Sequence, residues 1–323
     1  MKAFVTGAMG FLGKHLVDRL VADNHSVIIY DRKHIPSSEW GHWTYLHGDV
    51  LDLDGINGLR TAMQMVKPDV VFHLAALADV RSALKMPHQQ LEQNLIATFN
   101  VLEAMNAAEV KRIAFTSTAV VYGDTGDYPV WGATKVGGPI TAQSISERSF
   151  SFPQQTSIYG AMKLASESLI SAYCEGYGMS ADILRLVSVV GAGYRHGNLK
   201  DFYDRLTANP QSLQLFGNPA QTKYYIAVED MIDALLFTVN RNHTGAELWN
   251  VSHHAPNTIQ DSIDAVCDVL GIPPPAVTGG ESWPGDLPQL VLDCSKLRTL
   301  GWSPKVDIKT AMRATVSDLM KRT

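Results

Sequence analysis

Cysteine is scarce in this chain, which has three in 323 residues. Cys174, Cys267 and Cys294 lie far apart and form no pair at metal-ligand spacing. We therefore expect free thiols in a reducing compartment, the cytoplasm, and no bound metal. Long apolar runs are also missing, since no stretch reaches the roughly 18 residues that cross a bilayer. A net charge of −5 gives no reason to expect nucleic acid or an anionic membrane as partner.

The first half of the chain alternates short apolar segments with amphipathic ones. The apolar segments are rich in β-branched residues, as strands buried on both faces of a parallel sheet are, and span 2–6, 26–30, 70–74, 112–117 and 181–187. His73 falls in one of them, and we expect it to be a hydrogen-bonded core residue. Segments long enough for crossover helices lie between them, at 11–22, 53–66, 90–108 and 157–175. This alternation predicts an α/β fold with a doubly wound parallel sheet of Rossmann type.

The texture of the sequence changes after residue 188, where Gly, Pro and Asn become frequent. We expect residues 1–187 to form a dinucleotide-binding domain and 188–323 to form mainly a smaller, loop-rich substrate-binding domain, with 222–252 returning to the first. Residues 124–156 show no clear pattern of their own. A stretch of that length in a compact domain is usually functional or disordered, so it is a candidate for shaping or covering the substrate pocket.

Three glycines, Gly7, Gly10 and Gly13, follow the first strand and open the first helix. This spacing suits a pyrophosphate, because a side chain would block the tight turn or the approach of backbone amides, and the helix N-terminus is partly positive. Asp31 ends the second strand, where a carboxylate can accept hydrogen bonds from both adenosine ribose hydroxyls and would repel a 2′-phosphate. Arg32 and Lys33 follow at once, so NAD is favoured while NADP stays open.

Tyr159 and Lys163 stand four residues apart in "SIYGAMKLASES", on one face of a predicted helix. A free tyrosine has a pKa of about 10 and is barely ionised near neutral pH. A neighbouring ammonium lowers that pKa, which makes Tyr159 a candidate general base. Thr118, at the carboxyl end of a predicted strand, can donate and accept a proton. We expect the pair to face a cleft while a separate apolar stripe packs on the sheet, formed by Met162, Ala165, Leu169 and Ala172.

These motifs occur with others along almost the whole chain: TGAMGFLG (6–13), Asp31, GDV (48–50), HLAA (73–76), Asn94 with Thr98, TSTAVVYG (116–123), YGAMK (159–163), YYIAVEDM (224–231) and GDLPQLVLDCSKLRTLGWSP (285–304). In them the chain resembles the NAD-dependent epimerase/dehydratase family of extended short-chain dehydrogenases/reductases, which modifies sugar nucleotides. The resemblance implies NAD, a nucleotide-sugar substrate, and a homodimer through a four-helix bundle of 87–108 and 157–175. It also implies cofactor contacts from Gly7, Gly10, Phe11, Leu12, Gly13, Asp31, Arg32, Asp49, Val50, Leu74, Ala75, Ala76, Asn94, Thr116, Tyr159 and Lys163.

Within that family, the two residues after the catalytic hydroxyl separate the reactions. The 4,6-dehydratases resemble one another in having Asp-Glu there, the decarboxylases have Glu second, and the fucose-synthase-like reductases have cysteine first. Ala119 and Val120 occupy these positions here and cannot transfer protons. We therefore expect simple oxidation and reduction at one carbon, as in a 4-epimerase that forms a transient 4-keto sugar. Tyr159 would be its base, Lys163 the activating cation, and Thr118 the proton shuttle or orienting group.

The substrate side departs from the family pattern at three positions. Ser188 stands where the epimerases have Asn, while Lys223 and Trp283 replace two diphosphate-binding arginines. A lysine keeps the charge but lacks the planar fork that holds two phosphate oxygens. The resemblance still implies substrate contacts, which we expect from Thr118, Ser188, Asn198, Leu199, Lys223 and Asp286, but neither the sugar nor the nucleotide base is specified.

Two functions of other classes stay open. One is a net dehydrogenase or reductase of a sugar or smaller hydroxy compound, which would exchange free NAD(P)(H) and change the near-ultraviolet absorbance of the cofactor. The other is a non-catalytic NAD-sensing or scaffold protein. The intact set of Thr118, Tyr159 and Lys163 argues against that second function.

Overall fold

The computed structural model describes residues 1–35, 41–81, 83–123, 134–135, 143–147, 155–218, 220–281 and 290–322. Its contacts divide the chain into two units. The first comprises 1–121, 158–185 and 232–249, and the second comprises 122–157, 186–231 and 250–323. Asp286, Trp283 and most of the 124–156 stretch lie outside the described residues.

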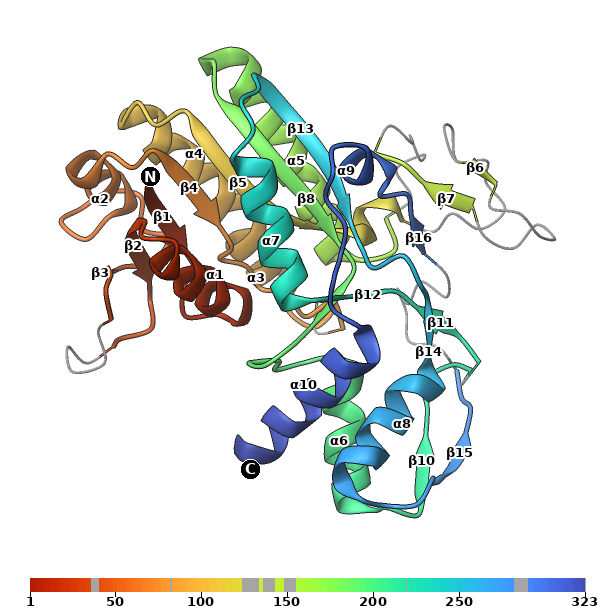
Figure 1. Ribbon diagram of the computed structural model, residues 1–323. Coiled ribbons are helices and arrows are strands. Elements are labelled where there is room, and N and C mark those ends of the chain that lie inside the picture. The colour runs from red at the N-terminus through yellow and green to blue at the C-terminus, as the bar shows by residue number, and fades with distance from the viewer. Residues whose placement is uncertain are drawn as a thin grey trace. The chain divides into compact units, whose positions relative to one another are not determined.

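A seven-stranded sheet in the order β13-β8-β5-β4-β1-β2-β3 forms the centre of the first unit (Figure 1). Neighbouring strands β1–β2, β1–β4, β2–β3 and β4–β5 pair in parallel, which confirms the predicted Rossmann-type sheet. The short β3 was not predicted from the sequence. The strands are β1 Lys2–Thr6, β2 Ser26–Asp31, β3 Thr44–His47, β4 Val70–His73, β5 Arg112–Thr118, β8 Ser180–Leu186 and β13 Gly245–Val251.

Helices cover both faces of this sheet (Figure 1). One face carries α2 (Leu59–Val66), α4 (Ala97–Ala107) and α5 (Ile158–Tyr177). The other carries α1 (Phe11–Ala22) and α7 (Val228–Val239), which the ion pair Arg19–Asp233 joins at 3.7 Å. The predicted helix 90–108 begins with a short helix α3 (Pro87–Gln90) and continues as a π-helix (Leu91–Ile96) before α4.

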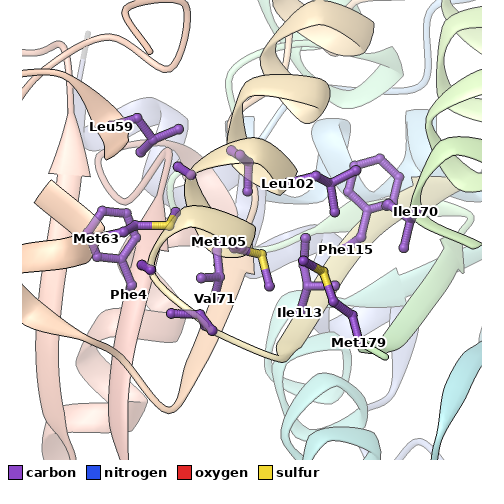
Figure 2. Packing of buried hydrophobic residues seen from close by; sticks show 14 of the residues in the cluster. Phe4, Leu59, Met63, Val71, Leu102, Met105, Ile113, Phe115, Ile170 and Met179 are labelled. Atoms are coloured by element: carbon purple, nitrogen blue, oxygen red, sulfur yellow. The ribbon is translucent and has the colours of Figure 1, made fainter. Parts of the chain in front are cut away.

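The core beneath α2, α4 and α5 draws on both layers (Figure 2). Strand residues such as Phe4, Val71 and Phe115 are fully buried against Met63 of α2 and Leu102 of α4. Burying each such side chain stabilises the fold by about 1.5–3 kcal/mol. This packing fixes the strands, and thereby the loops that leave their carboxyl ends, where ligands bind in such sheets.

The second unit contains three helices that pack on one another, which the sequence analysis did not delimit: α6 (Asn198–Ala208), α8 (Ile259–Leu270) and α10 (Ile308–Arg322). Thr258 caps α8 reciprocally with Asp261, as in a capping box. Short strand pairs complete the unit: β9 (Ser188–Val190) with β12 (Tyr225–Ala227), β11 (Thr222–Lys223) with β14 (Asn257–Thr258), β10 (Ser212–Gln214) with β15 (Ala276–Thr278), and β7 (Gln143–Ile145) with β6 (Thr134–Lys135) and β16 (Val291–Leu292). The short α9 (Ser295–Thr299) follows β16.

All three cysteines are buried and free. Burial raises the pKa of Cys174 to about 11 and that of Cys294 to about 12, which keeps these thiols protonated and unreactive near neutral pH. Among the described ranges, no helix combines the length and the apolar character that a membrane crossing requires.

Candidate active site

The glycine turn between β1 and α1 leaves no room for side chains. Gly7 has a positive φ of 69°, and a Cβ there would lie 2.6 Å from the Ala75 backbone nitrogen. A Cβ on Gly13 would lie 2.2 Å from the Gly7 carbonyl oxygen. Gly10 caps α1, whose first turn carries no acidic residue, so the positive end of the helix is unopposed. Backbone, rather than side chains, lines the place predicted for the pyrophosphate.

Asp31 ends β2 beside this turn. Its carboxylate accepts hydrogen bonds from the backbone N–H of Met9 and of Lys33, both at 2.9 Å. The guanidinium of Arg32, the residue after Asp31, lies 3.5 Å from the Asp49 carboxylate. This ion pair partly neutralises the charge of Arg32. A carboxylate so placed suits ribose hydroxyls and opposes the extra phosphate of NADP. This arrangement fits the prediction of NAD.

Asp49 and Val50, predicted to flank the adenine, are held by a residue that the sequence analysis missed. The Asn100 side-chain amide donates to the carbonyl oxygens of Val50 and Leu51, both at 3.0 Å. Asn100 is buried on α4, and Val50 is buried beneath it. The sequence carried one signal for this role, an asparagine between the apolar residues Phe99 and Val101 of a predicted helix. If such an amide is buried, it needs hydrogen-bond partners.

A chain of buried hydrogen bonds joins the glycine turn to the helices. Thr6 Oγ1 lies 2.8 Å from His73 Nδ1, and His73 Nε2 lies 3.1 Å from Thr98 Oγ1. Thr98 donates in turn to the Asn94 carbonyl oxygen, which also accepts from Ser166 of α5. His73 is 1% exposed, which confirms that it is a hydrogen-bonded core residue. Burial lowers the pKa of His73 to about 3, so it is neutral.

The loop after β4, where Leu74, Ala75 and Ala76 were predicted to border the cofactor, is fixed by Asn94. Its side chain accepts from the Leu77 N–H at 3.0 Å and donates to the Leu77 carbonyl oxygen at 3.2 Å. Asn94 lies in the π-helix, a form that often occurs at functional sites. The structure thus assigns Asn94 the holding of this loop; direct contact with the cofactor stays a prediction.

Lys163 and Tyr159 both lie on the buried face of α5. Lys163 is 1% exposed, donates to the Thr116 carbonyl oxygen at 2.9 Å, and lies 4.3 Å from the centre of the Phe115 ring. The contact to Thr116 brings α5 against β5 two residues before Thr118, where that strand ends. Thr118 Oγ1 accepts from the Val120 N–H at 3.2 Å and keeps its own proton to donate.

The ionisation of these two groups is set first by burial. Burial raises the pKa of Tyr159 above its usual value, and it lowers the pKa of Lys163 to about 7. The Glu167 carboxylate, one turn along α5, acts in the opposite direction and raises the pKa of Lys163. We therefore expect Tyr159 to become a base only when positive charge lies beside it, and Lys163 to supply that charge only while it keeps its proton.

The expected orientation of α5 was wrong in one respect. Ala172 is exposed and Met162, Ala165 and Leu169 are half-buried, so this stripe is not the face that lies on the sheet. The buried face is the one with the catalytic pair, and it continues through Ser166, Glu167, Ile170, Tyr173 and Cys174. Lys163 and Glu167 have hydrogen-bond partners on the strands, whereas Ser166 and Tyr173 have theirs on the π-helix and α4.

Two of the predicted substrate residues of the second unit, Ser188 and Asn198, are connected to Tyr225. Ser188 of β9 is exposed and pairs with Tyr225 of β12, while Lys223 lies two residues before it. The Tyr225 hydroxyl contacts the Asn198 side chain at the start of α6. Leu199 is fully buried, so its side chain packs in the unit. Asp286 and Trp283 fall outside the described part of the chain.

Among the residues that the structure describes, no group of three or more His, Cys, Asp or Glu side chains is arranged to hold a metal ion. The first unit instead brings together a glycine cradle, a carboxylate at the end of β2, and a tyrosine with a buried lysine. These features define a dinucleotide-dependent enzyme of the short-chain dehydrogenase/reductase type.

Comparison with known proteins identifies the family. The chain matches the NAD dependent epimerase/dehydratase family over residues 3–252. It is 28% identical to a putative UDP-glucose 4-epimerase of Methanocaldococcus jannaschii, over 97% of this chain and 96% of that one. It is also 28% identical to the UDP-glucose 4-epimerase of Mycolicibacterium smegmatis, over 98% and 97%. The structure of the Thermus thermophilus UDP-glucose 4-epimerase with NAD matches with a TM-score of 0.83 at 27% identity, over 100% of both chains.

The chain therefore belongs to the NAD dependent epimerase/dehydratase family, and its cofactor is NAD. The residues present fit this group. Gly7, Gly10 and Gly13 leave the backbone cradle open, the Asp31 carboxylate lies beside it, and Lys163 places a buried cation next to the strand that ends in Thr118.

Proposed function

We propose that the protein is a nucleotide-sugar 4-epimerase. The observation that carries this proposal is the pair that follows Thr118. Ala119, which is 4% exposed, and Val120 begin the short 3-10 helix after β5. Their side chains are apolar, so neither can give or take a proton. Elimination of water would require such groups, whereas oxidation and re-reduction at one carbon with NAD as hydride acceptor needs from the protein only a base, a cation and a hydrogen-bonding hydroxyl.

In this reaction Tyr159 removes the proton of the sugar C4 hydroxyl. NAD⁺ held by the glycine turn of Gly7, Gly10 and Gly13 and by Asp31 would supply hydride acceptance from C4 and hydride return to the opposite face of the 4-keto sugar. Tyr159 then gives the proton back, so the reaction has no net redox change. Lys163 stabilises the Tyr159 phenolate as long as the lysine itself is protonated. Thr118 donates a hydrogen bond to the C4 oxygen or passes the proton to it.

We infer that the nucleotide diphosphate is held in the second unit by Lys223 and Asn198, with Ser188 beside them and Leu199 packed beneath the start of α6. The support is that Ser188 pairs with Tyr225, that the Tyr225 hydroxyl contacts the Asn198 side chain, and that Lys223 lies two residues before Tyr225. Lys223 neutralises phosphate charge as a point cation without the bidentate geometry of arginine. We therefore expect weaker selection of the nucleotide than an arginine pair would give.

A panel of nucleotide sugars tests the reaction. UDP- and dTDP-linked hexoses, N-acetylhexosamines and uronic acids are incubated with the purified protein without added NAD⁺, and the products are separated by chromatography. C4 epimers are expected from at least one of them, and Tyr159→Phe should lose nearly all turnover while it retains bound cofactor. A net change in cofactor absorbance with external NAD⁺, or turnover that survives Tyr159→Phe, would contradict the proposal.

We further infer a homodimer formed by the segments 87–108 and 157–175. Leu91, Ile96 and Phe99 are about two-fifths exposed, at 39%, 41% and 39%. The stripe of Met162, Ala165, Leu169 and Ala172 on α5 is half-buried or exposed as well. Neighbouring apolar residues at the surface of two adjacent helices are typical of a face that a partner covers. A second copy of the chain is the partner that the resemblance implies.

The compartment is inferred from the thiols. Three buried, unpaired cysteines suit a reducing environment, and we place the protein in the cytoplasm. Fractionation of the producing cells followed by detection of the protein tests this inference, and recovery from an oxidising compartment would contradict it.

A further inference from the structure

A buried polar cluster lies on the sheet beneath α5, and none of its residues is among the proton-transfer groups named above. It consists of Ser117 of β5, Glu167 of α5 and Arg185 of β8, which are 4%, 4% and 7% exposed. Arg185 holds the Glu167 carboxylate through two nitrogens, with Nη2 2.6 Å and Nε 3.1 Å from its oxygens. The Ser117 hydroxyl donates to the same carboxylate. One side chain of α5 is thus tied to two adjacent strands.

We propose that Glu167 is a positioning residue for the epimerase reaction, which holds α5 in register with the end of β5 and keeps a negative charge beside Lys163. This inference rests on the proposed role of Tyr159 as the base.

The contacts of Glu167 connect α5 with β5 close to the residues of the proposed reaction. Ser117 immediately precedes Thr118, and Glu167 lies one helical turn beyond Lys163. Residues four apart on a helix are neighbours, with Cβ atoms about 5–6 Å apart. The contact of Glu167 with Ser117, together with the contact of Lys163 with Thr116, therefore connects consecutive residues of β5 with consecutive turns of α5. A shift of the helix along the strand would break both.

Stability alone does not account for this cluster. A buried ion pair costs much of its Coulomb energy in lost hydration, and replacing it with packed apolar side chains is often neutral or stabilising. Its best-attested benefit is the fixing of one arrangement among several, which is what a site built from two separate elements requires.

The groups that surround Lys163 also support a role for Glu167 in keeping the lysine charged. His73 on β4 faces it and is neutral, Phe115 and Thr116 of β5 offer a ring and a carbonyl oxygen, and Asn94 of the π-helix is uncharged. On α5, Tyr159 is protonated at rest and Glu167 favours the charged lysine, while Arg185 of β8 is engaged by Glu167. Without the carboxylate, Lys163 loses its proton at lower pH and Tyr159 loses its cation.

The test titrates Tyr159 directly. The protein is loaded with NAD⁺ without sugar, and phenolate absorbance is followed against pH after subtraction of the Tyr159→Phe signal. Glu167→Gln should move the midpoint upward by about one pH unit and lower kcat near pH 7.5 by about 10-fold, with KM little changed. The double variant Glu167→Gln/Arg185→Met removes both members of this ion pair, and should move the midpoint in the same direction by less.

Asp182→Asn provides the matched control. Asp182 is also a buried carboxylate on β8, held by Arg112 of β5 at 3.1 Å, but at the opposite end of these strands. It should cost stability without moving the Tyr159 midpoint. Unchanged midpoint and kcat in both Glu167 variants, or an equal shift in Asp182→Asn, would overturn the proposal. If Glu167→Gln does not fold, the double variant decides.

The two proposals fail separately. The phenolate titration needs no sugar, so a protein that converts none of the panel could still show the Glu167 effect, and then only the epimerase assignment falls. If the protein converts a nucleotide sugar but its Tyr159 titration midpoint is unchanged in the Glu167 variants, only the positioning role of Glu167 falls.

Discussion

The ammonium group of Lys163 lies 2.9 Å from the Thr116 carbonyl oxygen and 4.3 Å from the centre of the Phe115 ring, with only 1% of the residue exposed. A carbonyl oxygen, a ring face and a nearby carboxylate replace its water. Burial lowers the pKa of Lys163 to about 7. The residue that we propose activates Tyr159 is therefore one whose burial destabilises the fold.

Lys163→Met should make the protein more stable and inactive. The folded pKa of about 7 lies below the unfolded value of 10.5, so the unfolded state binds more protons between these values, and the native protein gains stability as pH rises through that window. The variant lacks this gain, and near pH 7 its free energy of unfolding should exceed that of the native protein by about 1–2 kcal/mol. Urea denaturation at several pH values measures the difference.

Lys111→Met is the control for this variant. Lys111 also donates to a single carbonyl oxygen, that of Tyr177, at 2.9 Å, but it is exposed. Its replacement should change stability by no more than about 0.5 kcal/mol. A Lys163 variant that is less stable than the native protein across this pH range would show that the buried lysine is not a burden on the fold.

Local spacing predicted the tight glycine turn and the position of Asp31 beside it. Gly7, Gly10 and Gly13 act within one turn, and Asp31 contacts Met9 of that same turn. Such contacts depend on chain geometry over a few residues and on a strand that ends where its apolar run ends. Each could be read from residue type and separation alone.

The orientation of α5 could not be read in the same way. Apolarity placed Met162 and Leu169 on the sheet, whereas the fold leaves both half-buried and buries Ser166 and Glu167. Glu167 is accommodated by Ser117, 50 residues before it, and by Arg185, 18 residues after it. A polar residue is buried when its partners meet it in space, and those separations carry no local signal.

Alanine at Gly7 should abolish cofactor binding and destabilise the protein. The new Cβ would meet the Ala75 backbone at 2.6 Å with φ at +69°, so backbone on both sides would have to move. We expect a loss of about 2–4 kcal/mol in the free energy of unfolding. Thermal unfolding with and without NAD⁺ separates the two effects, because NAD⁺ should no longer raise the melting temperature.

Gly176→Ala is the matched substitution. Gly176 lies in α5, and a Cβ there has nothing within 4 Å. Alanine should stabilise the helix by about 0.5–1 kcal/mol and leave the response to NAD⁺ intact. If Gly7→Ala behaved like Gly176→Ala, the close-packed cradle would not be what binds the cofactor.

Charge on the exposed apolar face should dissociate the homodimer. Ile96→Glu/Phe99→Glu places two carboxylates where the two copies are expected to meet, and burying them unpaired would cost several kcal/mol. Light scattering after size-exclusion chromatography should give the dimer mass for the native protein and the monomer mass for this variant. Ile56→Glu, at a residue that is 91% exposed and outside both segments, should stay dimeric. A native monomer would remove the inference.

The buried chain through His73 fixes its tautomer. Thr98 donates its single hydroxyl proton to the Asn94 carbonyl oxygen, so the Thr98 hydroxyl oxygen accepts a hydrogen bond from His73 Nε2–H. The other ring nitrogen, His73 Nδ1, then accepts from the Thr6 hydroxyl. Nitrogen NMR of the labelled protein should show this neutral tautomer well below pH 6. An imidazole that titrates near its ordinary pKa would contradict the arrangement.

His73 also makes stability depend on pH. Its folded pKa of about 3 lies below the unfolded value of 6.5, so the unfolded state takes up a proton first, and stability falls as pH drops below 6.5 until it levels near 3. This residue should contribute a slope of about 1.4 kcal/mol per pH unit within that window. His73→Gln keeps one donor and one acceptor for Thr98 and Thr6 but cannot titrate. Denaturation between pH 5 and 7, with exposed His88→Gln as control, should show the slope reduced only in His73→Gln.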